Sequence, residues 1–255
     1  MRRAVAVLAG GLGTRVAHLT DADGPKAMLP VCGRPFIDLK LAELVAAGAD
    51  DIVVLVGHGA GALRAHVGVH TEAGVPVAFV DDGPELLGTG GAIRRALSLL
   101  PDPFWVTYGD TLLDVDVAPP EERLSRSPRV QGVMTVLRNA DRWARSNVSI
   151  DDEMLVTAYD KTSPPGSHDY IDYGMLLLRH EVFEPRPADA AFDLVDALQD
   201  TVADRRLAAS VVHERFHDIG TEDAWRDTDR WARTTDLPGR LREKIEDRAA
   251  HRELS

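Results

Sequence analysis

The chain has 255 residues, 44% of them hydrophobic, which is enough to bury the core of one large or two modest domains. Its formal net charge of −12 excludes the broad basic surface that binds DNA or RNA, although a few clustered cations could hold a small anion. A single cysteine excludes an internal disulfide, and no apolar run approaches a signal peptide or the roughly 20 residues of a membrane span. We therefore expect a globular, cytoplasmic protein.

The first half of the chain alternates short apolar runs with amphipathic segments. This alternation predicts an α/β fold with a mostly parallel sheet covered by helices on both faces. Ligands of such sheets bind beyond the carboxyl ends of the strands. The expected strands are 4–8, 52–56, 75–80 and 104–107, and the expected helices are 36–47, 60–67 and 91–100.

The second half has a more mixed pattern, which ends in a charged helix at 240–253 with an apolar stripe of Leu241, Ile245 and Ala249. That stripe would allow a homodimer. Pro119-Pro120 and Pro164-Pro165-Gly166 are expected in surface loops. The other expected elements are strands at 130–137, 147–150, 155–159, 170–178 and 210–213, a helix at 192–202, and helical structure from 222 onward.

A glycine cluster, LAGGLGTR at 8–15, follows the first expected strand. Glycine-rich turns at strand ends commonly bind phosphate, because the ligand can approach the backbone amides. The common phosphate motifs do not fit this turn. Val16 stands where a dinucleotide fingerprint requires glycine, which disfavours an NAD(P)-dependent oxidoreductase, and no Gly-Lys-Ser/Thr closes the turn as a nucleotide-binding P-loop would need.

A longer ordered pattern does fit. LAGGLGTR is followed after ten residues by KAMLPV, and then by LGTGGAI (87–93), YGDTLLD (108–114), YDK (159–161), YIDYGMLLL (170–178) and HDIGTEDAW (217–225). Over residues 4–225 this order resembles the sugar-1-phosphate nucleotidyltransferases, and it is most similar to their heptose-1-phosphate guanylyltransferase branch.

The resemblance implies a Rossmann-like, three-layer α/β/α nucleotidyltransferase fold of the glycosyltransferase-A type, with a mostly parallel mixed sheet. It implies a nucleotidyltransferase domain at 1–235, with an NTP-binding part at about 1–115 and a sugar-phosphate-binding part at about 116–235. Residues 236–255 then form a charged helical tail.

The reaction implied is that of an NTP with a sugar-1-phosphate to give an NDP-sugar and pyrophosphate. We favour GTP with a heptose-1-phosphate or a similar hexose-1-phosphate. Mannose- or glucose-1-phosphate with GTP, UTP, dTTP or CTP remain alternatives. A non-catalytic regulatory subunit that binds a nucleotide-sugar is an alternative of another class.

Nucleotidyl transfer needs an immobilised triphosphate and neutralised charge. Bare glycine amides could wrap the β- and γ-phosphates, Arg15 could clamp them with two hydrogen bonds, and Lys26 could place a positive charge at the α-phosphate. Arg15, Lys26 and Asp110 are the expected catalytic residues. The expected nucleotide-binding residues are Leu8, Gly10, Gly11, Gly13, Thr14, Asp81, Gly88, Thr89 and Gly109.

Two carboxylates are expected to hold Mg²⁺. Asp110 follows an apolar strand at the ligand edge of the sheet, where a carboxylate can hold Mg²⁺ against phosphate oxygens. Asp218 matches the second metal carboxylate of the resembled family. Two structural alternatives stay open, since Asp110 could cap a turn and Asp218 could cap the helix that begins near Glu222.

The resemblance places the sugar-1-phosphate at Asn147, Asp160, Lys161, Asp172 and Gly174. Lys161 would hold the phosphate, although an ordinary solvated lysine is an alternative. Asp160 replaces the usual glutamate, and Asn147 replaces a glycine that many relatives have.

A separate acidic segment, with Asp81, Asp82 and Glu85, could accept hydrogen bonds from a nucleobase. A carboxylate would suit the N1 and N2 hydrogens of guanine, but it also suits the N3 hydrogen of uracil or thymine. The same three residues could instead form a plain polar loop.

Overall fold

The structure is a computed structural model that describes residues 2–11, 14–19, 24–57, 60–83, 86–187 and 189–253. It divides into two compact units. Unit 1 comprises residues 1–83, 108–112 and 216–255, and unit 2 comprises residues 84–107 and 113–215. The units therefore interleave along the chain, whereas the sequence analysis divides it near residue 115. The helical tail belongs to unit 1.

Unit 1 is built on three parallel strands, in which β1 (Ala4–Leu8) pairs with β4 (Asp51–Val56) and β4 pairs with β5 (Val77–Asp81). Val5 to Val7 and Ile52 to Val56 are buried, as expected of strands whose two faces are both covered. The helices of this unit are α1 (Phe36–Ala46), α2 (Gly61–Val67), α6 (Glu222–Thr234) and α7 (Leu237–Glu253).

Short elements complete unit 1. The 3₁₀ helices η1 (Thr14–Leu19) and η2 (Lys26–Met28) are followed by the hairpin of β2 (Pro30–Val31) and β3 (Arg34–Pro35). A second antiparallel pair joins β7 (Thr111–Leu112) to β13 (His217–Asp218). These short elements are below the length that periodicity can detect in a sequence.

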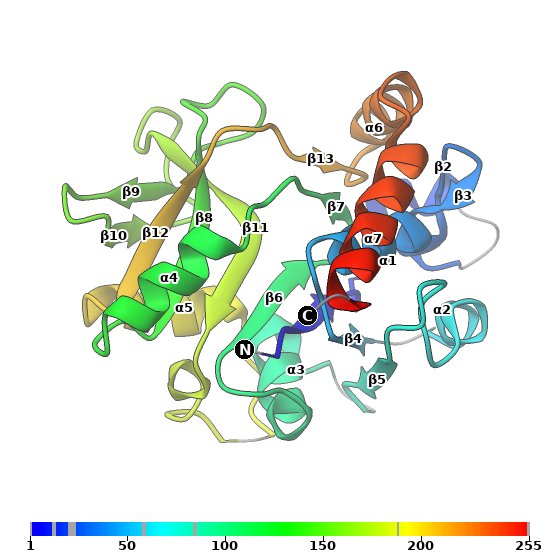
Figure 1. Ribbon diagram of the computed structural model, residues 1–255. Helices are drawn as coiled ribbons and strands as arrows, with labels where there is room; N and C mark the ends of the chain where they lie inside the picture. The colour runs from blue at the N-terminus through cyan, green and yellow to red at the C-terminus, as the bar shows by residue number, and fades with distance from the viewer. Residues whose placement is uncertain are drawn as a thin grey trace. The chain divides into compact units, whose positions relative to one another are not determined.

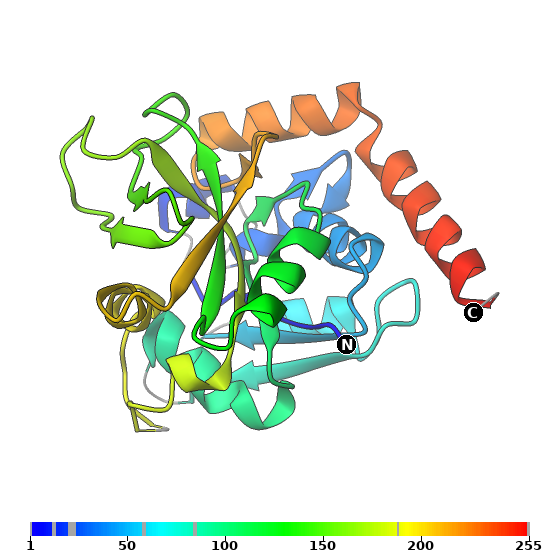
Figure 2. The ribbon, with the colours of Figure 1, turned by 60° about the vertical axis from the view of Figure 1, so that its left-hand side comes forward.

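One apolar core holds the helices of unit 1 to these short elements. It contains Leu29, Phe36, Leu112, Ile219 and Leu241, which come from five separate segments. Figure 1 shows α7 alongside α1, and Figure 2 shows α7 continuing from α6 at an angle. Val16 is also buried in this core, so the residue that breaks the dinucleotide fingerprint has a packing role.

Unit 2 has a mostly antiparallel sheet. In it, β11 (Tyr170–Leu178) pairs with β6 (Phe104–Tyr108), with β8 (Gly132–Arg138) and, at one position, with β9 (Val148–Ile150). The sheet also contains β10 (Val156–Tyr159), antiparallel to β9, and β12 (Leu207–Val212), parallel to β8. The helices are α3 (Gly88–Ala96), η3 (Leu97–Leu99), α4 (Ala118–Arg126), η4 (His180–Val182) and α5 (Leu194–Ala203).

One loop prediction is wrong. Pro119 and Pro120 lie in the first turn of α4 rather than in a surface loop. The first N–H groups of a helix have no intrahelical acceptor, so proline costs little there, and its fixed φ angle suits the helix. Pro164-Pro165-Gly166 does lie outside helices and strands, as expected.

The glycines of LGTGGAI have a packing role in unit 2. The amides of Gly90 and Gly91 donate to the carbonyl of Phe192, at 3.0 and 3.1 Å. A Cβ added to Gly91 would lie 2.5 Å from the carbonyl oxygen of Ala190. Helix α3 can therefore approach the segment before α5 only because these positions have no side chain.

This contact gives a stability prediction. Gly91→Ala is expected to lower the free energy of unfolding by about 1–3 kcal/mol, because backbone atoms cannot move aside cheaply. Gly61→Ala is the matched helical control, since no atom of the described residues lies within 4 Å of a Cβ built there. It is expected to be neutral or to stabilise by about 0.4–1 kcal/mol. Urea unfolding of both variants measures the difference, and equal stability would contradict the packing role.

Candidate functional site

Lys26 and Asp110 form an ion pair in unit 1, with 2.7 Å between Nζ and Oδ2. Lys26 opens η2, and its side chain is 13% exposed, whereas that of Asp110 is 41% exposed. Asp110 lies in the turn that leads to β7, and its Oδ1 also accepts a hydrogen bond from the Thr111 hydroxyl. The sequence prediction paired these two residues with one phosphate site, and the structure brings their charged ends together.

Gly109 sets the position of Asp110. Its amide donates to the carbonyl of Leu8, at 2.9 Å. A Cβ at Gly109 would lie 3.1 Å from the Leu8 carbonyl oxygen and 3.2 Å from the Cβ of Ala9. The chain before Asp110 therefore passes close to the end of β1, where the glycine-rich turn begins.

Asp218 lies on β13, directly opposite Thr111 of β7. The amide of Ile219 donates to the carbonyl of Asp110, at 3.1 Å, which ties the backbones next to the two aspartates together. Asp218 Oδ1 accepts from the amide of Gly220, and a Cβ at Gly220 would lie 2.9 Å from that oxygen and 3.7 Å from Lys26 Nζ. Asp218 Oδ1 and Lys26 Nζ thus both lie close to the space beside Gly220.

Asp218 is not a helix cap. The N-cap of α6 is Thr221, whose side chain accepts from the amide of Ala224. The helix-capping alternative for Asp218 is therefore wrong, because a nearer residue fills that position.

The donor set in this corner of unit 1 fits a cation that shares its ligands with a substrate. Asp110 and Asp218 carry two negative charges beside the one positive charge of Lys26, and Mg²⁺ prefers oxygen ligands. Within the described residues, no group of three or more His, Cys, Asp or Glu side chains is placed to hold a metal. Mg²⁺ commonly uses only one or two carboxylates and takes phosphate and water oxygens for the rest.

The glycine-rich turn is described in part. The amide of Ala9 donates to the carbonyl of Leu55, and a Cβ at Gly10 would lie 3.1 Å from the amide nitrogen of Gly57. Gly10 therefore allows close contact with the end of β4. Among the described residues, no atom lies within 4 Å of a Cβ built at Gly11, which is exposed. Gly13 and the side chains of Thr14 and Arg15 lie outside the described residues.

Asp81, at the end of β5, accepts a hydrogen bond from Arg64 of α2. Arg64 in turn lies over the ring of Phe79, 4.9 Å from its centroid. This ion pair accounts for Asp81 without a nucleobase, so its predicted contact with the base stays a prediction. Asp82 is buried, and Glu85 lies outside the described residues.

Gly88 and Thr89 belong to unit 2, at the start of α3. Thr89 Oγ1 accepts from the amide of Leu194, at 2.8 Å, and lies 3.4 Å from Asp193 Oδ1. Gly88 has φ +71°, and a Cβ there would lie 2.6 Å from the carbonyl oxygen of Phe192. The structure thus gives both residues a role in joining α3 to α5, and their nucleotide contact stays a prediction.

The expected sugar residues form one hydrogen-bonded network in unit 2. Asn147 is buried, and its Oδ1 accepts from the amide of Asp172, at 2.9 Å. The carboxylate of Asp172 accepts from the amide of Gly174 and from the hydroxyl of Tyr159, at 2.9 and 2.8 Å. Tyr159 is a member of this network that the sequence analysis did not single out.

Asp160 and Lys161 follow β10. Hydrogen bonds from the side chains of Thr162 and Ser163 hold the pKa of Asp160 down at about 2, so its carboxylate stays charged at neutral pH. The amide of Asp160 donates to the carbonyl of Asn147, which ties this turn to the network. Lys161 is exposed, with Nζ 5.5 Å from the ring centroid of Tyr159.

Helix α6 clamps two segments of unit 1, namely the chain just after Lys26 and the strand that carries Asp218. Trp225 Nε1 donates to the carbonyl of Pro30, and Asp229 Oδ1 accepts from the amide of Cys32, so both fix the chain just after Lys26. Thr228 Oγ1 donates to the carbonyl of Asp218, at 2.7 Å. Trp231 stacks on His217, with ring centroids 3.7 Å apart. The sequence analysis gave none of these residues a role, although His217 and Trp225 lie in the HDIGTEDAW motif; Thr228, Asp229 and Trp231 carry only a helical spacing.

The clamp gives a second prediction. Thr228 is buried, so Thr228→Val would leave the carbonyl of Asp218 without this donor at nearly unchanged volume. We expect the free energy of unfolding to fall by about 1–3 kcal/mol. We also expect Thr228→Val to shift the Mg²⁺ dependence of turnover, and Thr228→Ser to restore both properties. Loss of stability with an unchanged Mg²⁺ dependence would contradict positioning of Asp218.

A glycine-rich turn at a strand end, with a lysine and two carboxylates beside it, is the arrangement that the sequence analysis expects of a nucleotidyltransferase. The chain belongs to the family with a MobA-like NTP transferase domain, whose model matches residues 5–145. Fold class and enzyme class are thereby confirmed, as is the resemblance seen in the sequence motifs. None of the described helices combines the length and apolar character that crossing a bilayer requires.

Two curated relatives are informative. The chain is 25% identical to the D-glycero-alpha-D-manno-heptose 1-phosphate guanylyltransferase of Campylobacter jejuni, over 84% of this chain and 93% of that protein. It is 32% identical to the mannose-1-phosphate guanylyltransferase of Mycobacterium tuberculosis, over 71% of this chain and 50% of that protein.

Solved structures share the fold. HddC from Yersinia pseudotuberculosis, crystallised with GMP-PN, has a TM-score of 0.73 at 24% identity, over 90% of this chain and 99% of that one. A putative glucose-1-phosphate thymidylyltransferase from Bacillus anthracis has a TM-score of 0.76 at 20% identity, over 91% of this chain and 95% of that one.

Proposed function

We propose that the protein transfers a guanylyl group from GTP to a heptose-1-phosphate or a similar hexose-1-phosphate, and releases pyrophosphate. The observation that carries the proposal is the convergence of Lys26 with Asp110 and Asp218 at the end of β1. The two guanylyltransferase relatives support the choice of GTP, and the heptose-phosphate relative supports the sugar. A cytoplasmic location is part of the proposal.

Unit 1 is proposed to bind the triphosphate. The amide of Gly11, where a Cβ would meet no described atom, would donate to phosphate oxygens, and Arg15 would clamp them with its planar guanidinium. Lys26 would exchange its contact with Asp110 for the α-phosphate as negative charge develops there. Asp110 and Asp218 would hold Mg²⁺, which when bound supplies neutralisation of phosphate charge.

Unit 2 is proposed to bind the sugar-1-phosphate. Lys161, which is exposed beside the ring of Tyr159, would hold the phosphate. Asp172 would accept hydrogen bonds from ring hydroxyls. Its carboxylate is oriented by Gly174 and Tyr159, and its backbone by Asn147, so it needs little reorganisation to receive a sugar.

The chemical step would be an in-line displacement. An oxygen of the sugar phosphate forms a bond to the α-phosphorus of GTP, while the bond from that phosphorus to the α–β bridging oxygen breaks. Pyrophosphate leaves with the bonding electrons, and the product is a GDP-sugar. The nucleophile is already an anion, so no protein group has to remove a proton from it, and the residues act by positioning and charge neutralisation.

The test is a panel of nucleoside triphosphates against sugar-1-phosphates, read as pyrophosphate release and compared by kcat/KM. We expect GTP with a heptose-1-phosphate to give the highest value. Preference for mannose- or glucose-1-phosphate, or for UTP, dTTP or CTP, would correct the substrate and keep the reaction. Nucleotide binding by calorimetry without Mg²⁺-dependent turnover would overturn the reaction and favour a regulatory subunit.

A further inference from the structure

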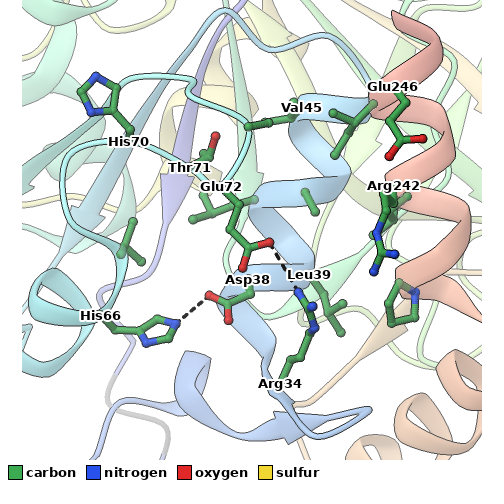
Figure 3. Close-up of a pocket in the computed structure, with 17 residues that line it drawn as sticks. Arg34, Asp38, Leu39, Val45, His66, His70, Thr71, Glu72, Arg242 and Glu246 are labelled. Atoms are coloured by element: carbon green, nitrogen blue, oxygen red, sulfur yellow. Dashed lines mark hydrogen bonds and ion pairs between the residues drawn. The ribbon is translucent and has the colours of Figure 1, made fainter. Parts of the chain in front are cut away.

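Unit 1 contains a cavity of about 480 Å³ that none of Lys26, Asp110 and Asp218 lines. Its walls are α1, the segment that begins at the end of α2, and α7 (Figure 3). Leu39 and Val45 of α1 and Ile245 of α7 give it apolar sides. The pairs His66–Asp38 and Arg34–Glu72, at 2.7 and 3.5 Å, lie along the wall opposite α7 in Figure 3.

Helix α7 is held at both ends and borders the cavity between them. Leu237 and Leu241 are buried in the core of unit 1. At the other end, Arg248 lies against the turn after α1, because a Cβ at Gly48 would be 2.0 Å from Arg248 Nη2. The central turns of α7 are therefore fixed in position, while one of their faces remains accessible.

The accessible face of α7 carries an exposed cation and an exposed anion one helical turn apart. Arg242 and Glu246 both line the cavity, and Figure 3 shows both projecting from α7. In the described ranges of the chain, neither of them forms an ion pair or a hydrogen bond. An unpaired Arg–Glu combination at this spacing is a charge pattern that another surface could complement.

This charge pattern is complementary to itself. If a second α7 runs antiparallel and is related by a two-fold axis at the level of residue 244, Arg242 lies opposite the partner's Glu246, and Glu246 lies opposite the partner's Arg242. Successive residues of a helix are rotated by about 100°, so Lys244 points away from the face that carries Arg242 and Glu246. Lys244 of one copy therefore does not meet Lys244 of the other copy at the two-fold axis. A two-fold contact on this face therefore pairs unlike charges.

Apolar surface accompanies these charges. Ile245 is only half-buried and Ala249 is exposed, although both belong to the apolar stripe of α7. Val69, in the segment whose neighbours Val67 and His70 line the cavity, is 70% exposed. Association of two copies would cover such surface, which lone chains rarely expose in clusters.

We propose that this groove is a homodimer interface, in which α7 of a second copy lies antiparallel to α7 beside the cavity. The proposal does not depend on the reaction catalysed. It assigns the cavity to side chains of the partner copy, and it gives the charged tail a role in assembly.

A charge-swap experiment tests it by sedimentation equilibrium and light scattering. The unchanged protein is expected at twice the 27.8 kDa of the chain. Arg242→Glu and Glu246→Arg each place like charges opposite one another, so each is expected to weaken association more than tenfold. The double variant Arg242→Glu/Glu246→Arg restores unlike pairs and is expected to dimerise again. Glu243→Arg, outside the cavity lining, controls for net charge.

Circular dichroism and melting curves verify that each variant is folded. The proposal is overturned if the unchanged protein stays at the mass of one chain up to about 100 μM. It is also overturned if the single variants dimerise like the unchanged protein, or if the double variant remains as monomeric as the single ones. The proposal would also be overturned if the protein were monomeric and bound a small molecule in the cavity.

Discussion

Replacing Asp110 by asparagine is expected to lower kcat by about 10³-fold, which corresponds to about 4 kcal/mol of transition-state stabilisation. Asparagine keeps the size of the side chain but removes its charge, so both the proposed cation ligand and the partner of Lys26 are weakened. Pyrophosphate release at saturating substrates measures the effect.

Asp152→Asn is the matched control, because Asp152 is an exposed carboxylate in the turn between β9 and β10. It is expected to leave kcat unchanged, and thermal melting verifies that both variants are folded. If Asp110→Asn kept kcat within about threefold of the unchanged enzyme, Asp110 would have no part in the chemistry.

Replacing Lys26 by glutamine is expected to lower kcat by about 10²–10³-fold, because a nearly buried positive charge at the proposed α-phosphate position is lost. Lys26→Arg is not expected to restore activity, since the larger, planar guanidinium cannot replace a compact ammonium group in this position. Lys244→Gln, at an exposed position of α7, makes the same chemical change away from the site and is expected to be silent.

The pair Lys26 and Asp110 also predicts non-additivity. Because the two residues touch and are proposed to serve one step, the double variant Lys26→Gln/Asp110→Asn is expected to lose far less than the product of the two single losses. If the two losses multiply, the two side chains act independently. That result would contradict a shared role for the two residues, whose charged ends lie 2.7 Å apart.

Much of the fold can be predicted from local pattern. The strands β1, β4 and β11 lie within one residue of the predicted ranges, because long buried strands show as continuous apolar runs. Helix α4 was missed because the two prolines suggested a loop, although the first turn of a helix accepts proline. The short pair β7 and β13 carries no periodic signal.

Individual residues of the candidate site could be predicted only where they lie in a motif of the resembled family. Lys26 and Asp110 are 84 positions apart, and nothing local to either shows that they meet. The ordered motifs supplied that information, and the structure supplies the contact. The clamp by α6 could not be predicted, since Trp225 reaches a carbonyl 195 positions away and Thr228 reads as an ordinary helix residue.

The division of the chain could not be read from composition either. The predicted boundary near residue 115 assumed that each part is continuous in sequence. In the structure, residues 216–255 return to unit 1, because Ile219, Ala232 and Leu241 complete the core around Phe36. Burial between segments so far apart in the sequence produces no recognisable pattern in the residues near position 115.

Binding of Mn²⁺ followed by electron paramagnetic resonance, with a non-hydrolysable GTP analogue present, tests most directly whether Asp110 and Asp218 share one cation beside Lys26. The proposed centre predicts that Asp110→Asn and Asp218→Asn each weaken Mn²⁺ binding more than tenfold, while Asp152→Asn does not. Equal Mn²⁺ affinity in all four proteins would contradict it.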